Sequence, residues 1–162
     1  MSAAYPVLVS GLGTARCVRV FAGEPRQVPL VRAWVARALA GCPAQEALLT
    51  CVSELAANAI EHTASGDDGV FTVEVSWAAE GAARVSVTDA GSPFEPAVGQ
   101  VAEAATPHVT EDEPDPSFAE GGRGLILVAA CSSRWGYRDA ATGEGTGRTV
   151  WAEADWREAN VA

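Results

Sequence analysis

The chain has 162 residues, 48% of them hydrophobic, which is enough for one domain with its own apolar core. Its formal net charge is −10, and none of its 11 basic residues is a lysine. The lack of lysine excludes a P-loop, a Schiff-base enzyme and the lysine-dependent site of eukaryotic-type protein kinases. The acidic balance argues against direct nucleic-acid binding, because that binding depends on neutralising phosphates with cationic side chains.

The cysteines give no sign of a metal or redox site. The sequence holds four of them: Cys17, Cys42, Cys51 and Cys131. They form no C-x-x-C pair and have no ligand-like spacing to a histidine, so we expect buried, reduced thiols. No run reaches ~18 apolar residues and the first residues lack a basic leader, so we expect a soluble, cytoplasmic protein without membrane contact.

The first half of the chain predicts one strand followed by two helices. Residues 17–21 alternate as a short strand, and Pro25 then opens a helix that runs to about Ala40. A second helix is predicted from about Ala44 to Thr63. Helical spacing places two apolar sets inward: Val28, Val31, Val35, Ala38 and Leu39 in the first helix, and Leu48, Cys51, Val52, Leu55 and Ala59 in the second.

The second half predicts a β-hairpin, an irregular stretch, a helix and two strands. Residues 70–77 and 83–89 alternate with period two and form the hairpin. The pattern is lost from Ala90 to Gly122, where prolines and an acidic cluster occur, and a stretch of this length is usually functional or mobile. Residues 124–132 predict a buried helix.

Two closing strands are predicted, over residues 133–139 and 147–154. The order is therefore strand, two helices, hairpin, loop, helix and two strands, without an internal repeat or a domain linker. Hairpin-joined strands with helices on one side predict an α+β two-layer sandwich instead of a doubly wound parallel sheet.

Four polar residues share one face of the second predicted helix. At ~100° per residue, Asn58 lies about 40° from Glu54, Glu61 about 20° the other way and His62 about 80° round. On spacing alone this is a solvated helix face. The surrounding alanines and Ile60 leave little other polar surface, and the oxygens of Glu54 and Asn58 suit Mg²⁺ or an attacking hydroxyl.

Two glycine motifs complete the set of candidate sites. Asp89 ends a predicted strand and Gly91 follows after one intervening residue, which is either an ordinary turn or a carboxylate placed to accept from a ligand amine. Residues 121–125, GGRGL, precede a helix, where freed N–H groups either bind an anion or simply form the helix start.

The order of these motifs is more specific than any one of them. E-L-x-x-N-x-x-x-H, then D-x-G, a long loop and G-G-x-G-L resembles the GHKL ATPases, and most closely the small anti-sigma-factor serine/threonine kinases. The resemblance covers about Pro25 to Ala154. It implies a Bergerat-type fold with a mixed, mostly antiparallel sheet and helices on one face. The single domain would span residues 1–162, with a core at about 17–156 and a lid at about 92–120.

The resemblance also implies roles for individual residues. Asn58 would coordinate Mg²⁺ that bridges the phosphates of ATP, and Glu54 would be the general base for the attacking hydroxyl. Asp89 would accept a hydrogen bond from the amino group of adenine, and Gly91 would let the base pack closely. Thr149 would be linked to Asp89 through a water molecule. Further nucleotide contacts or supporting roles would come from Glu61, His62, Gly122, Arg123, Gly124 and Leu125.

The function implied is that of an Mg-ATP-dependent regulator. It would phosphorylate a serine or threonine on an antagonist protein and otherwise sequester a sigma factor, with a homodimer as one possible assembly. The alternative is a non-catalytic ATP-binding switch that acts on its partners by binding only, because Glu54 and Asn58 are also compatible with tight binding alone.

Overall fold

The computed structural model describes residues 15–66, 68–78, 81–90, 122–142 and 145–156. The helices and strands follow the predicted order: β1 (Ala15–Ala22), α1 (Val28–Ala38), α2 (Gln45–His62), β2 (Val70–Ala78), β3 (Ala82–Thr88), α3 (Gly122–Cys131), β4 (Arg134–Thr142) and β5 (Gly145–Asp155). Single 3₁₀ turns precede α1, as η1 (Pro25–Gln27), and follow α2, as η2 (Ala64–Gly66). The proline-led start of the first predicted helix is thus a 3₁₀ turn that leads into α1.

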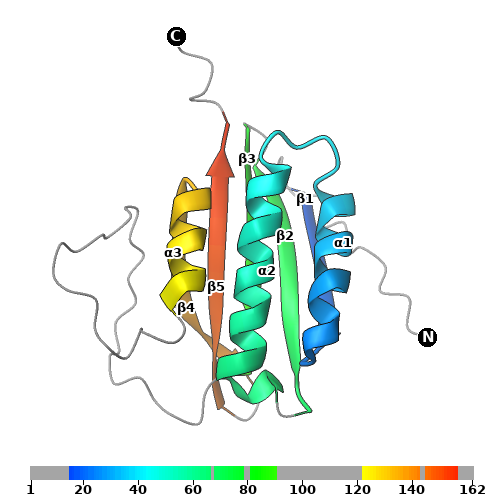
Figure 1. Ribbon diagram of the computed structural model, residues 1–162, viewed down its shortest axis with the longest axis vertical. Helices are drawn as coiled ribbons and strands as arrows, with labels where there is room; N and C mark the ends of the chain where they lie inside the picture. The colour runs from blue at the N-terminus through cyan, green and yellow to red at the C-terminus, as the bar shows by residue number, and fades with distance from the viewer. Residues whose placement is uncertain (1–14, 67, 79–80, 91–121, 143–144, 157–162) are drawn as a thin grey trace, which may run out of the picture.

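The five strands form one sheet in the order β1-β2-β3-β5-β4. All four pairings among the described strands are antiparallel, so the mixed sheet implied by the resemblance is antiparallel in this part of the chain. The three helices cover one face of the sheet, with α2 in the middle (Figure 1). The predicted α+β two-layer sandwich is therefore confirmed.

The core lies between this sheet face and the helices. Alternation on the hairpin turns Val73, Val75, Val85 and Val87 inward, and all four are at most 2% exposed. The predicted inward set of α2 is buried in full, and in the α1 set Val28 and Ala38 are only partly buried. Each fully buried aliphatic side chain contributes about 1.5–3 kcal/mol, so this layer fixes where α2 lies on the sheet.

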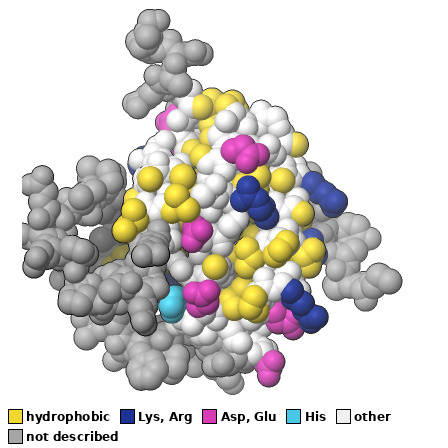
Figure 2. All heavy atoms as spheres, viewed as in Figure 1, with side chains coloured by type: hydrophobic (Ala, Val, Ile, Leu, Met, Phe, Trp, Pro, Cys, Tyr) yellow, Lys and Arg dark blue, Asp and Glu magenta, His cyan; other side chains and the backbone are white. Residues whose placement is uncertain are grey.

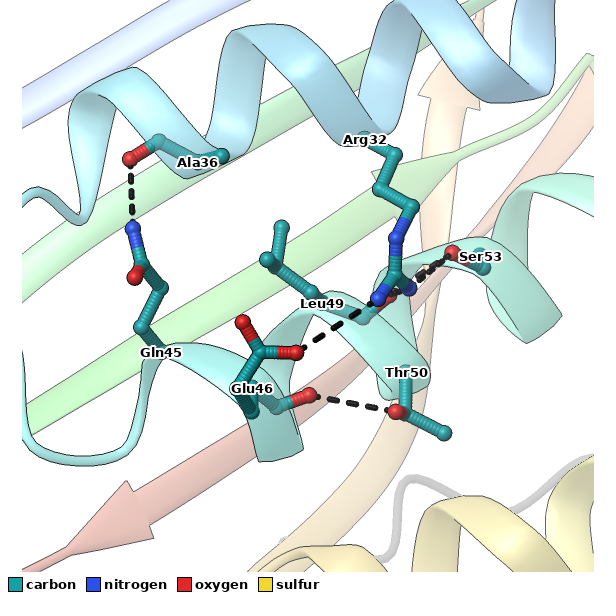
Figure 3. A network of polar contacts seen from close by, with 7 residues as sticks. All are labelled: Arg32, Ala36, Gln45, Glu46, Leu49, Thr50 and Ser53. Atoms are coloured by element: carbon teal, nitrogen blue, oxygen red, sulfur yellow. Dashed lines mark hydrogen bonds and ion pairs between the residues drawn. The ribbon is translucent and has the colours of Figure 1, made fainter.

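A polar network fixes α2 against α1 as well (Figure 3). Nη1 of Arg32 in α1 donates to the carbonyl oxygen of Leu49 at 3.0 Å and to Oγ of Ser53 at 3.2 Å. Near the start of α2, Nε2 of Gln45 donates to the carbonyl oxygen of Ala36 at 2.7 Å. The helix that carries the candidate site is therefore held by apolar packing below and by hydrogen bonds along its side.

The third helix is less buried than its apolar sequence predicts. Val128 is fully buried, but Ile126 is 69% and Leu127 39% exposed, and hydrophobic side chains show on the surface of α3 (Figure 2). The prediction of a buried helix is wrong here because α3 packs through one stripe only, which Val128 shares with Leu125 and Cys131. In the described parts of the chain, no helix combines the length and hydropathy needed to span a membrane.

All four cysteines are free thiols. Cys42 and Cys51 are buried as expected, whereas Cys17 and Cys131 are only half-buried. Burial raises the pKa of Cys51 to about 12, with a smaller contribution from Cys131. The Cys51 thiol therefore stays protonated at neutral pH, as an unreactive core residue does.

Candidate functional site

The polar face of α2 meets the first turn of α3 at Gly124. A β-carbon at position 124 would lie 2.9 Å from Oε2 of Glu54 and 3.5 Å from both Oδ1 and Nδ2 of Asn58. Glu54 and Asn58 are both half-buried, and Gly124 is buried between the two helices. Two motifs that lie 66 residues apart, counted from Asn58 to Gly124, are thus brought into direct contact.

The close approach explains why glycine stands at position 124. A larger side chain would displace the Glu54 carboxylate, because 2.9 Å is shorter than real β-carbon contacts. With glycine, the carboxylate of Glu54 and the amide of Asn58 lie beside the backbone of a helix N-terminus, where N–H groups lack intrahelical acceptors. The arrangement combines hard oxygen donors with a helix end that favours anions.

A magnesium ion fits this donor set only if a ligand completes its coordination. Among the described residues, no group of three or more His, Cys, Asp and Glu could hold a metal by itself. Mg²⁺ in proteins is commonly bound by one or two protein oxygens together with substrate phosphates and waters. Oδ1 of Asn58 can serve as such a ligand, with phosphates placed against the first turn of α3.

The other two polar residues of the predicted stripe lie apart from this contact. The side chains of Glu61 and His62 are 67% and 51% exposed, and Nε2 of His62 lies 3.8 Å from Oε2 of Glu61. They occupy the last turn of α2, beyond the point where α3 meets the helix. The supporting roles of Glu61 and His62 in nucleotide binding stay predictions.

Asp89 follows the last residue of β3 and is 8% exposed. Its backbone N–H donates to the carbonyl oxygen of Arg148 on β5 at 2.9 Å, and its Oδ1 accepts from the backbone N–H of Arg148 at 3.2 Å. A carboxylate has acceptor sites for further donors beyond this one. The neighbouring strand thus orients the side chain of Asp89.

Thr149 lies on β5, opposite Thr88 of β3. Its Oγ1 is 2.8 Å from Oγ1 of Thr88, its cross-strand partner in the β3–β5 register. Successive side chains of a strand point to opposite faces, and Val87 and Val150 point toward the helices. Thr88 and Thr149 therefore face away from the helices, and the residue of β5 that lies beside Asp89 is Arg148.

Arg148 is a site neighbour that the sequence analysis missed. Its guanidinium carbon lies 4.9 Å from the centre of the Tyr137 ring on β4. The backbone of Arg148 makes two hydrogen bonds with Asp89. The only sequence signal for Arg148 is its place directly before Thr149. The motif thus indicates the correct strand, but the side chains of these two consecutive residues point to opposite faces of the sheet.

A second missed residue connects the end of α2 with Asp89. Ser65, in the turn η2, is completely buried, and its Oγ accepts the backbone N–H of Ala90 at 3.0 Å. Ala90 directly follows Asp89, so the turn after α2 and the end of β3 are in contact.

The remaining predicted residues are only partly covered by the structure. Gly91 and the predicted lid at 92–120 lie outside the described residues. Gly122 and Arg123 form the first turn of α3. Leu125 is half-buried and packs against the hydrophobic core, so its side chain supports the position of α3.

Comparison with known proteins identifies the family of the chain. No curated protein matches the chain significantly. A family model of the histidine kinase-like ATPase domain matches residues 21–153, which include α2, Asp89, Gly124 and most of β5. The match covers well over half of the chain and supports the GHKL resemblance seen in the motif order. The chain belongs to the histidine kinase-like ATPase family.

Proposed function

We propose that this protein is a cytoplasmic Mg-ATP-dependent kinase of the anti-sigma-factor type. It phosphorylates a serine or threonine of an antagonist protein, and in the other state of the cycle it sequesters a sigma factor. The family supplies the expectation of ATP binding. The kinase activity and both partners are our extension from the motif order and the site geometry.

The observation that carries the proposal is the contact of Gly124 with Glu54 and Asn58. The carboxylate of Glu54 and the amide of Asn58 both lie close to Gly124 in the first turn of α3, and we assign to them the roles of general base and metal ligand. Phosphoryl transfer needs these three elements together, because its catalysis consists mainly of positioning and of stabilising charge on the phosphate oxygens. A solvated helix face would not require a glycine opposite its carboxylate.

In the proposed reaction, the hydroxyl oxygen of the antagonist's serine or threonine attacks the γ-phosphorus of ATP. The new O–P bond forms as the bond to the β,γ-bridging oxygen breaks, and ADP leaves with that electron pair. Glu54 accepts the hydroxyl proton, Asn58 holds the metal, and the amides of Gly122 and Gly124 donate to phosphate oxygens. When bound, Mg²⁺ neutralises phosphate charge, which allows a protein of net charge −10 to bind ATP without lysine.

The test of the proposed function is transfer of label from γ-labelled ATP. The full chain is incubated with Mg²⁺, labelled ATP and candidate antagonist proteins from the same organism, and the acid and base stability of the product distinguishes a phosphoserine or phosphothreonine from a phosphohistidine. Label on a serine or threonine of one antagonist is the expected result. ATP binding without transfer to any antagonist would favour the non-catalytic switch.

Replacing Gly124 with alanine is expected to separate stability from activity. Alanine favours the helix by about 1 kcal/mol over glycine, and the atom it meets is the movable end of Glu54, so the melting temperature should be unchanged or higher. Phosphoryl transfer should fall by about 10-fold, because Glu54 is displaced from its position. Calorimetric melting and single-turnover transfer, measured on one preparation, check the two expectations.

Gly136→Ala is the matched control for this substitution. A β-carbon at Gly136 on β4 would also lie 2.9 Å from its nearest neighbour, but that neighbour is the indole of Trp151. This variant should lose about 1–3 kcal/mol of stability through overpacking and keep its ATP affinity. Equal loss of activity in both variants would mean that Gly124 acts only through packing.

A further inference from the structure

We propose that Ser65 is a positioning residue for nucleotide selectivity, which sets Asp89 relative to the phosphate side of the site. The inference rests on the proposed function, in which Asp89 accepts a hydrogen bond from the amino group of adenine. It assigns to a buried serine, outside all the sequence motifs, the task of holding the peptide that follows Asp89. Ser65 itself does not touch the nucleotide.

The contact at its centre is the hydrogen bond from the backbone N–H of Ala90 to Oγ of Ser65, at 3.0 Å. Ser65 is completely buried, whereas Ala90 is exposed. On the other side of the same short segment, the backbone N–H of Asp89 donates to the carbonyl oxygen of Arg148. Two consecutive amides are thus held from opposite directions, by β5 and by the turn after α2, which fixes the orientation of the peptide between them.

Ser65 is held in turn by the end of α2. Its backbone N–H donates to Oγ1 of Thr63 at 3.1 Å, and Oγ1 of Thr63 donates to the carbonyl oxygen of Ala59 at 2.5 Å. Ala59 is the neighbour of Asn58 in the helix. A continuous series of hydrogen bonds therefore runs from the turn of α2 that carries Asn58 to the residue beside Asp89.

The backbone of Ser65 is also confined from the side of β1. A β-carbon at Gly23, directly after β1, would lie 1.4 Å from the carbonyl oxygen of Ser65. Only glycine fits there, so the turn of Ser65 is packed against the strand end and has little freedom to shift. A serine in such a fixed position can act as a geometric reference for Ala90.

This arrangement predicts that Ser65 affects selectivity more than folding. If the Ala90 amide is released, Asp89 keeps its strand partner Arg148 but the following peptide can rotate. The carboxylate then discriminates less well between the amino group of adenine and the carbonyl oxygen of guanine. A residue that only stabilised the fold would weaken the binding of both nucleotides alike.

The test compares Ser65→Ala with Ser86→Ala in the full chain. Ser86 lies on β3, three residues before Asp89, and faces away from the helices like Thr88. In Ser65→Ala, the backbone amide of Ala90 should exchange with solvent about 10-fold faster, because its acceptor is gone. The ratio of ATP to GTP affinity should fall by about 3- to 10-fold. Ser86→Ala should change neither quantity.

Two outcomes would overturn the inference. Unchanged exchange of Ala90 would mean that Ser65 does not hold this amide, and faster exchange with an unchanged ATP to GTP ratio would mean that the contact does not set selectivity. Thr63→Val removes the acceptor of the Ser65 backbone N–H. If the series of hydrogen bonds starts in α2, we expect this variant to lose the bond between Ala90 and Ser65 and to lower the ratio of ATP to GTP affinity as Ser65→Ala does. A wild-type chain that binds no ATP would instead overturn the proposed function, and the exchange measurement would still report on the contact.

Discussion

Replacing Glu54 with glutamine is expected to slow phosphoryl transfer by on the order of 100-fold or more, with ATP affinity within several-fold of wild type. Glutamine keeps the shape of the side chain beside Gly124 but cannot accept the hydroxyl proton. The base acts in the transition state, whereas the metal and the helix-end amides hold the ground state. Single-turnover transfer to an antagonist at saturating Mg-ATP, beside nucleotide affinity on the same preparation, measures both quantities.

Glu46→Gln is the control for this variant. Glu46 lies in the first turn of the same helix, its side chain is 84% exposed, and its nearest cation is Arg32 at 3.7 Å. Its removal should leave transfer unchanged, because exposed ion pairs contribute little. If Glu54→Gln lowers affinity and rate in parallel, then Glu54 is a metal ligand or a structural residue, and the assignment of the base is wrong.

Replacing Asp89 with asparagine is expected to weaken ATP binding by roughly 10- to 100-fold. The amide oxygen of the asparagine can still accept the backbone N–H of Arg148, so the variant retains this hydrogen bond. Its amide nitrogen then replaces the second carboxylate oxygen and presents a donor to the adenine amino group, which is also a donor. Calorimetric titration of the variant with ATP and GTP checks the result.

The ratio of the two affinities distinguishes a specific role of Asp89 from a general loss of binding. A donor at this position suits the carbonyl oxygen of guanine, so GTP binding should weaken less than ATP binding or improve. Unchanged ATP affinity in Asp89→Asn would exclude Asp89 as the adenine-binding carboxylate. A parallel loss for both nucleotides, with a lower melting temperature, would show that the carboxylate only stabilises the end of β3.

The periodic part of the fold could be predicted from the sequence because burial follows the period of each element. Alternation in the hairpin predicted the strands β2 and β3, and helical spacing identified the buried face of α2. The same reasoning failed for α3, where nearly every residue is apolar. In such a segment, composition does not tell which side meets the core, and Ile126 and Leu127 are exposed.

The candidate site could be predicted where its residues lie in one motif and not where it depends on strand register. The spacing of Glu54 and Asn58 placed both on one helix face, and the glycine motif pointed to Gly124. The motif order pointed to Thr149, whereas the residue of β5 in contact with Asp89 is Arg148, and a shift of one residue along a strand reverses the side to which a side chain points. The register that pairs Thr149 with Thr88 comes from contacts between segments 61 residues apart.

Ser65 had no sequence signal at all. It lies in a turn of Ser, Gly and Asp that reads as an ordinary helix stop, and its partner Ala90 is 25 residues away. Its burial depends on Gly23, a third segment that packs against the same turn. Residues of this kind become visible only when the tertiary contacts of the backbone are known.

The most direct test of a single Mg-ATP site at Glu54, Asn58, Asp89 and Gly124 is a titration of the isotope-labelled full chain with ATP, followed by its backbone amide resonances. With Mg²⁺ present, the amides of Asn58, Ala90 and Gly124 should shift together and saturate at one equivalent of ATP. With the metal chelated, the shifts at Asn58 and Gly124 should need a much higher ATP concentration, since Asn58 then has no metal to hold. Shifts confined to other parts of the chain, or none at all, would contradict the proposed site.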